Sequence, residues 1–75
     1  MTSQTIVDKE TKTFLNSMSA NIVREYATNY WPSASGADWD GKRLFLRYNG
    51  SIKPHWHACS GTMAKELASW IKSKN

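Results

Sequence analysis

The chain has 75 residues, 40% of them hydrophobic and 21% charged, and ten Lys and Arg against six Asp and Glu give a net charge of +4. A chain of this length forms one domain with a thin core, since it buries only about 60% of the surface that it exposes when unfolded. The composition excludes a disordered chain and leaves little room for a deep, water-excluded active site. The basic balance favours acidic partners, such as nucleic acid or an acidic protein surface.

The single cysteine and the character of the first residues bear on the cellular compartment. Cys59 cannot form a disulfide within the chain, and the first 25 residues lack the basic start and the apolar run of a signal peptide. No apolar stretch approaches the roughly 20 residues needed to span a bilayer. We therefore expect a cytoplasmic protein without a membrane partner.

Apolar residues between Asp8 and Tyr30 recur at steps of three and four, which predicts an N-terminal helix. Thr5 or Asp8 can cap its start, and Trp31-Pro32 ends it because the residue before proline is pushed out of the α region. Ser and Asn at positions 16–21 favour turns over helix interiors, so a break there is an open alternative. Residues 1–7 are expected to fray.

The rest of the chain predicts a small sheet followed by a second helix. Residues 32–41 are expected to form a loop ending in a short strand at 37–39, with Asp40-Gly41 as a turn that sets Asp38 opposite Arg43. Strand-forming residues around Asn49-Gly50 predict a hairpin over about 43–59. Ser60 or Thr62 then caps a helix with apolar residues at helical spacing.

These elements predict a fold of the α+β class. It consists of an N-terminal helix, a two- or three-stranded antiparallel sheet, and a C-terminal helix packed on one sheet face. Packing both amphipathic helices on one face of the sheet buries their apolar stripes. The whole chain, residues 1–75, is expected to be a single small domain.

The register of the hairpin decides which residues face water. A two-residue turn at Asn49-Gly50 mixes apolar and charged residues on both faces. A loop of three or five residues instead makes one face wholly apolar, with Leu44, Leu46 and Tyr48 beside Trp56, Pro54, Ile52 and Ala58. A one-residue slip turns every side chain to the other face, so burial is a stronger guide to register than turn preference. We therefore predict the odd-numbered loop, with Trp56 facing inward.

This register gathers basic and aromatic residues on the outward face of the hairpin. The predicted partner-binding residues are Arg43, Phe45, Arg47, Lys53, His55 and His57. Arg47 would then face Lys53, and since like charges opposite one another destabilise a sheet, an acidic partner explains the cluster better than folding does. Arg and Lys neutralise phosphates, and Phe45 can stack on a base.

The alternation of His55, His57 and Cys59 along one strand is a candidate metal site. Residues two apart on a flat strand lie about 7 Å apart, and no second Cys/His pair supplies zinc-like spacing. Cys59 and His57 also lack the orienting third group of a nucleophilic site. We predict no catalytic residues, no enzyme activity, no cofactor and no small-molecule substrate. A zinc-dependent domain that uses these three residues is the alternative.

The sequence thus predicts a small, basic, monomeric binding module that acts as a regulator or inhibitor in nucleic-acid transactions. Its partner is either DNA or RNA itself, or an acidic surface of a protein machine such as RNA polymerase. In size and composition the chain is similar to the small regulators that phages and mobile elements direct at host enzymes. The choice between the two partners is left open.

Overall fold

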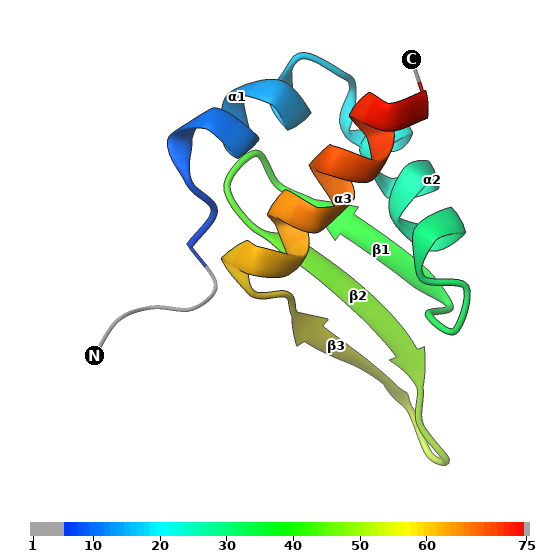
Figure 1. The fold of residues 1–75 in the computed structure, drawn as a ribbon. Helices are drawn as coiled ribbons and strands as arrows, with labels where there is room; N and C mark the ends of the chain where they lie inside the picture. The colour runs from blue at the N-terminus through cyan, green and yellow to red at the C-terminus, as the bar shows by residue number, and fades with distance from the viewer. Residues whose placement is uncertain (1–5, 75) are drawn as a thin grey trace.

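The computed structural model describes residues 6–74, which form three helices and a three-stranded antiparallel sheet (Figure 1). The helices are α1 (Lys9–Asn16), α2 (Ala20–Tyr30) and α3 (Gly61–Lys74), and the strands are β1 (Gly36–Trp39), β2 (Leu44–Asn49) and β3 (Pro54–Ala58). The strand order is β1-β2-β3, and α3 lies in front of the sheet in Figure 1. The predicted α+β class is confirmed. Within residues 6–74, no helix combines the length and apolar character that crossing a bilayer requires.

The predicted N-terminal helix is divided into α1 and α2. The break lies within the Ser- and Asn-rich segment 16–21, where the sequence left a break as an open alternative. Asp8 caps α1, because its carboxylate accepts the Thr11 N–H at 2.8 Å, and this bond lowers the pKa of Asp8. Ser19 caps α2 by accepting the Ile22 N–H at 3.3 Å. Of the segment predicted to fray, residues 1–5 lie outside the described part of the chain, and Val7 is buried in the core.

The core lies between the helices and one face of the sheet. Its large, fully buried side chains are Leu15, Val23, Leu44, Leu46, Cys59, Leu67 and Ile71. The strands contribute alternate residues to it, since Leu44 and Leu46 are buried and Phe45 between them is not. Because side chains alternate across a strand, the helices cover one face of the sheet and leave the other uncovered.

The predicted register of the hairpin is wrong. Leu46 lies opposite His57 rather than Pro54, and the Leu44 carbonyl accepts the Cys59 N–H at 2.8 Å. The connecting loop spans residues 50–53 and is therefore even-numbered. This loop turns every β3 side chain to the face opposite to the predicted one: Cys59 is fully buried and Trp56 is 52% exposed.

Burial was a misleading guide because no helix extends over β3. Its first four residues, Pro54 to His57, are all exposed. A strand in this position has no buried face, so its pattern of apolar residues does not report the position of the core. The register is instead anchored at its end, where Cys59 enters the core and the Ser60 hydroxyl caps α3 by accepting the Met63 N–H at 3.1 Å.

The β1–β2 connection also differs from the prediction, although the short strand at 37–39 is confirmed as part of β1. Asp38 lies opposite Phe45 rather than Arg43. The turn is closed by the Asp40 N–H, which donates to the Arg43 carbonyl at 3.3 Å. Gly41 within it has a φ of +94°, in the left-handed region that favours glycine.

The observed register predicts that the Cys59 thiol is protected in the folded protein. Burial excludes reagents and raises the pKa of Cys59 to about 11, so both access and ionisation oppose its reaction. A disulfide reagent at pH 8 should modify Cys59 only as denaturant unfolds the chain. The Ser51→Cys variant adds a thiol in the exposed loop and should show one fast and one slow reaction. Fast modification of Cys59 in the folded parent would contradict the register.

Candidate functional site

The uncovered face of the sheet, which we call the open face, is the candidate site. Its residues are Gly36 and Asp38 of β1, Phe45, Arg47 and Asn49 of β2, and Pro54, Trp56 and Ala58 of β3. Phe45 and Ala58 are not among the hydrophobic residues of the described chain that pack against the core. The open face is therefore a separate surface with its own aromatic residues.

Trp56 is the most exposed aromatic residue among residues 6–74, with 52% of its surface open to solvent. It lies directly opposite Arg47 and diagonal to Phe45, whose direct partner is Ala58. Directly opposite Cβ atoms are about 4.5–5.5 Å apart and diagonal neighbours about 7–8 Å, so the three side chains form one patch. Contiguous exposed apolar surface is common at interaction sites, so we treat this patch as the candidate.

Arg47 extends along the open face over β1. Its Nε donates to the Ser35 hydroxyl at 3.2 Å, and that hydroxyl donates to the Arg47 carbonyl at 3.1 Å. A Cβ at Gly36 would lie 3.5 Å from the Arg47 Nε, an ordinary van der Waals distance, which shows that the guanidinium lies against the β1 backbone. No carboxylate of residues 6–74 is within 4.0 Å of this guanidinium, and its terminal donors are free to bind a ligand.

Asp38 is the acidic residue of the open face, and α2 neutralises it. Arg24 forms a salt bridge with the Asp38 carboxylate at 3.1 Å, with 40% and 43% of the two side chains exposed. An exposed pair of this kind contributes at most about 1 kcal/mol to stability. Its greater effect is on charge, since it leaves the Arg47 cation uncompensated beside Trp56.

The prediction that the six binding residues share one face of the hairpin is wrong. Phe45 and Arg47 lie on the open face. His55 and His57 are exposed on β3 but point to the opposite side of the sheet, Lys53 lies in the β2–β3 loop, and Arg43 lies in the β1–β2 turn. Trp56 takes part in the open face, although the predicted register turns it toward the core. The signal that could have revealed it is Pro54, because a proline within a strand indicates an edge.

The candidate zinc ligands are not arranged around a common point. Cys59 is buried in the core, whereas His55 and His57 are exposed along β3. Within the described chain, no three His, Cys, Asp or Glu side chains gather closely enough to hold a metal ion. This arrangement gives the zinc alternative no support.

The chemistry of the open face is that of ring stacking and positive charge. Trp56 and Phe45 supply flat apolar surfaces, and Arg47 supplies a planar cation with several donors. No protein-family model, curated protein or solved structure matches this chain. The function must therefore be argued from the surfaces themselves.

Two tryptophans on opposite faces of the sheet should respond differently to truncation. Trp39 is 3% exposed and its indole N–H donates to the Asn16 side chain at 2.9 Å. Trp39→Ala should lower the free energy of unfolding by about 3–5 kcal/mol because it leaves a cavity. Trp56→Ala should lower it by less than about 1 kcal/mol. Urea denaturation followed by circular dichroism measures both, and equal losses would mean that Trp56 is a packed residue.

Proposed function

We propose that this protein is a non-enzymatic module that binds single-stranded nucleic acid on its open face. The observation that carries the proposal is the half-exposed Trp56, directly opposite Arg47 and diagonal to Phe45 on a sheet face without a helix. Bases stack on aromatic rings and the guanidinium group pairs with phosphate, which is how many proteins hold single strands.

Stacking determines the form of nucleic acid that the open face accepts. Bases in a duplex cover one another's faces, whereas an unpaired base can lie on a protein ring. Trp56 and Phe45 are diagonal neighbours, so each can take one base while the phosphate between them faces Arg47. Every base has a face that can stack, and such binding therefore tolerates many sequences.

A module of this kind can regulate other proteins by occupying the strand that they bind. Its net charge of +4 attracts an anionic strand over a distance set by the salt concentration. Once bound, it competes with other proteins for the same strand. This is the sense in which we propose that the protein acts as a regulator in nucleic-acid transactions.

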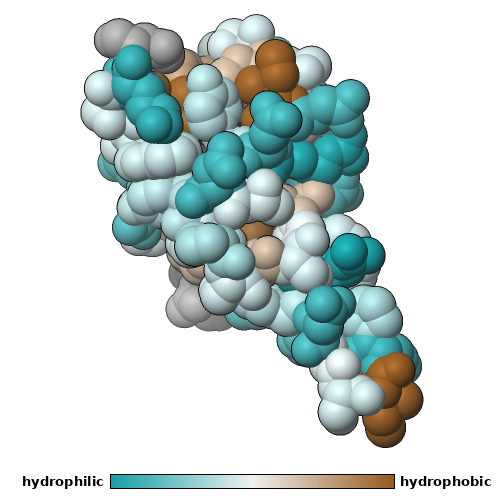
Figure 2. Space-filling view, turned by 90° about the vertical axis from the view of Figure 1, so that its right-hand side faces the viewer, coloured by the Kyte–Doolittle hydropathy of each residue, from teal (hydrophilic) through white to brown (hydrophobic). Residues whose placement is uncertain are grey.

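One observation favours a second candidate, a protein partner in place of nucleic acid. Figure 2 shows the β2–β3 hairpin extending away from the body, with a hydrophobic group at its end, where Ile52 is 94% exposed. An apolar side chain at a projecting tip suits a pocket on a protein more than a phosphate backbone. In this candidate the hairpin tip, rather than Trp56, would dominate the affinity.

Fluorescence anisotropy with a labelled oligothymidylate and a duplex of equal length tests the nucleic-acid proposal. The single strand should bind more tightly than the duplex. Trp56→Ala should weaken binding by about 10- to 100-fold, since a stacked base contributes about 1–3 kcal/mol. Ile52→Ala is the matched control, because it truncates an exposed apolar side chain of the same hairpin away from the open face.

Three outcomes would count against nucleic acid as the ligand. They are the absence of binding at low salt, an unchanged affinity in Trp56→Ala, and an equal loss of affinity in Ile52→Ala.

The salt dependence of binding tests the role of Arg47. If Arg47 contacts a phosphate, Arg47→Gln should reduce the slope of log K against log salt by about 0.7. An unchanged slope would remove Arg47 from the proposed contact.

A further inference from the structure

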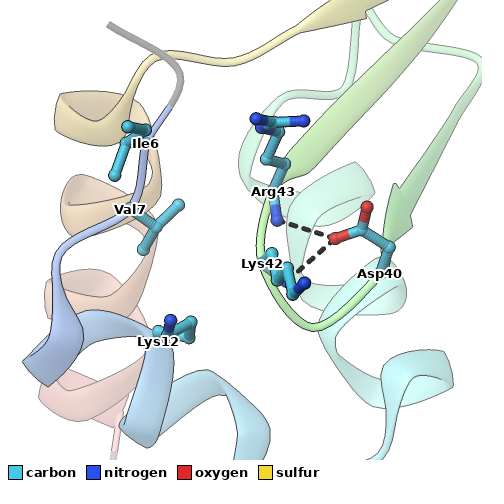
Figure 3. A pocket seen from close by; sticks show the side chains of 6 residues that line it. All are labelled: Ile6, Val7, Lys12, Asp40, Lys42 and Arg43. Carbon is cyan, nitrogen blue, oxygen red and sulfur yellow. Dashed lines mark hydrogen bonds between the residues drawn. The ribbon is translucent and has the colours of Figure 1, made fainter. Parts of the chain in front are cut away.

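A second surface, the turn pocket, lies between the N-terminal segment and the β1–β2 turn (Figure 3). Its volume is about 260 Å³, and its lining residues are Ile6, Val7, Lys12, Asp40, Lys42 and Arg43. Figure 3 shows Ile6, Val7 and Lys12 on one wall and Lys42 and Arg43 on the facing wall. The pocket includes no residue of the open face, so it raises a separate question of function.

Three of the lining residues are cations, and none of them is paired with a carboxylate. Among residues 6–74, the one salt bridge within 4.0 Å joins Arg24 and Asp38 on a different surface. Like charges that line one pocket repel each other. An anion between Lys12, Lys42 and Arg43 would remove this cost.

The single carboxylate of the lining, Asp40, is occupied by the turn itself. Its Oδ1 accepts the backbone N–H groups of Lys42 at 2.8 Å and Arg43 at 2.7 Å, on the side of the turn away from Ile6 (Figure 3). These bonds hold the pKa of Asp40 below its usual value, so Asp40 is ionised at neutral pH. Three cations and one carboxylate leave the lining with two net positive charges.

The two walls are held together before any ligand binds. Asn16, one helical turn after Lys12 on α1, donates from its amide to the Gly41 carbonyl at 3.0 Å. Its side-chain oxygen accepts the indole N–H of the buried Trp39 at 2.9 Å. The helix that presents Lys12 is thus tied to the turn that presents Lys42 and Arg43, which reduces the ordering that binding requires.

We propose that the turn pocket binds a phosphate monoester. The phosphoryl group of such a ligand carries about −1.5 to −2 charges at pH 7, which matches the net charge of the lining. Arg43 can hold two of its oxygens with a planar fork, and Lys12 and Lys42 act as point charges. Ile6, which is exposed, offers apolar surface to the organic group of the ligand.

Isothermal titration with phenyl phosphate, inorganic phosphate and the monoanionic diphenyl phosphate tests the proposal on the full chain. Phenyl phosphate should bind most tightly, because it combines two charges with a ring that can contact Ile6. Lys12→Ala and Arg43→Ala should each weaken its binding by about 10-fold, as expected for loss of a charged hydrogen bond. Lys53→Ala removes the same charge from the distant hairpin loop and should change the affinity by less than about 2-fold.

The absence of binding at millimolar phenyl phosphate would overturn the proposal. Equal weakening by Lys53→Ala and Lys12→Ala would also overturn it, because it would indicate general attraction to a basic protein. Circular dichroism of each variant checks that the fold is kept, and Lys12→Gln provides a variant that retains the length of the side chain. Trp56→Ala should bind phenyl phosphate normally. Because Trp56 belongs to the open face alone, this variant tests the phosphate site independently of the nucleic-acid site. Either proposal can therefore fail while the other holds.

Discussion

The packing of Leu44 and Leu46 beneath the helices determines which surfaces of this protein are available for binding. Both side chains are fully buried, and the alternation of a strand then forces Phe45 and Arg47 to the other side of β2. Cys59 extends the same constraint to β3, because its burial at the end of that strand places Trp56 beside Arg47. The open face is therefore a direct consequence of how the core is filled.

The positive charge of the chain is distributed unevenly between internal partners and free surfaces. Lys72 and Lys74, near the end of α3, lie over the rings of Phe14 and Trp70 at 4.8 and 4.4 Å from the ring centroids. Such contacts are favourable, and cations are also favoured at the end of a helix. Among the cations of residues 6–74 without a salt bridge or ring contact, Arg47 lies on the open face, and Lys12, Lys42 and Arg43 line the turn pocket. We assign ligands to these two places because each combines free positive charge with apolar surface.

Because β3 is an edge strand, the open face is bordered by backbone groups that pair with no other strand of the described chain. The hydrogen-bonded pairs at Cys59 and Lys53 imply that the backbone groups of Trp56 and Ala58 point away from β2. An unpaired edge invites association with other strands, and a proline and a lysine are among the residues that prevent it. Lys53 directly precedes β3 and Pro54 is its first residue, so the hairpin can expose Trp56 without offering a long free edge.

The sequence by itself determined most of the local elements of this protein. Periodicity located the helical segments, and Ser and Asn at 16–21 left open the break that separates α1 from α2. Asp8 and Ser60, each one of two candidate caps, cap α1 and α3. These features depend on neighbours within a few residues, and so does the hairpin. Of the candidate site, the sequence identified Phe45 and Arg47 but placed Trp56 in the core.

Only the tertiary structure decided the register of β3 and the existence of the turn pocket. The register depends on whether a helix covers β3, and that coverage follows from the packing of the whole domain rather than from the pattern of the strand itself. The turn pocket joins Lys12 to Lys42 and Arg43, whose proximity arises when Asn16 bonds to the Gly41 carbonyl. Contacts between residues far apart in the chain leave no periodic signal in the sequence, so three-dimensional packing alone brings them together.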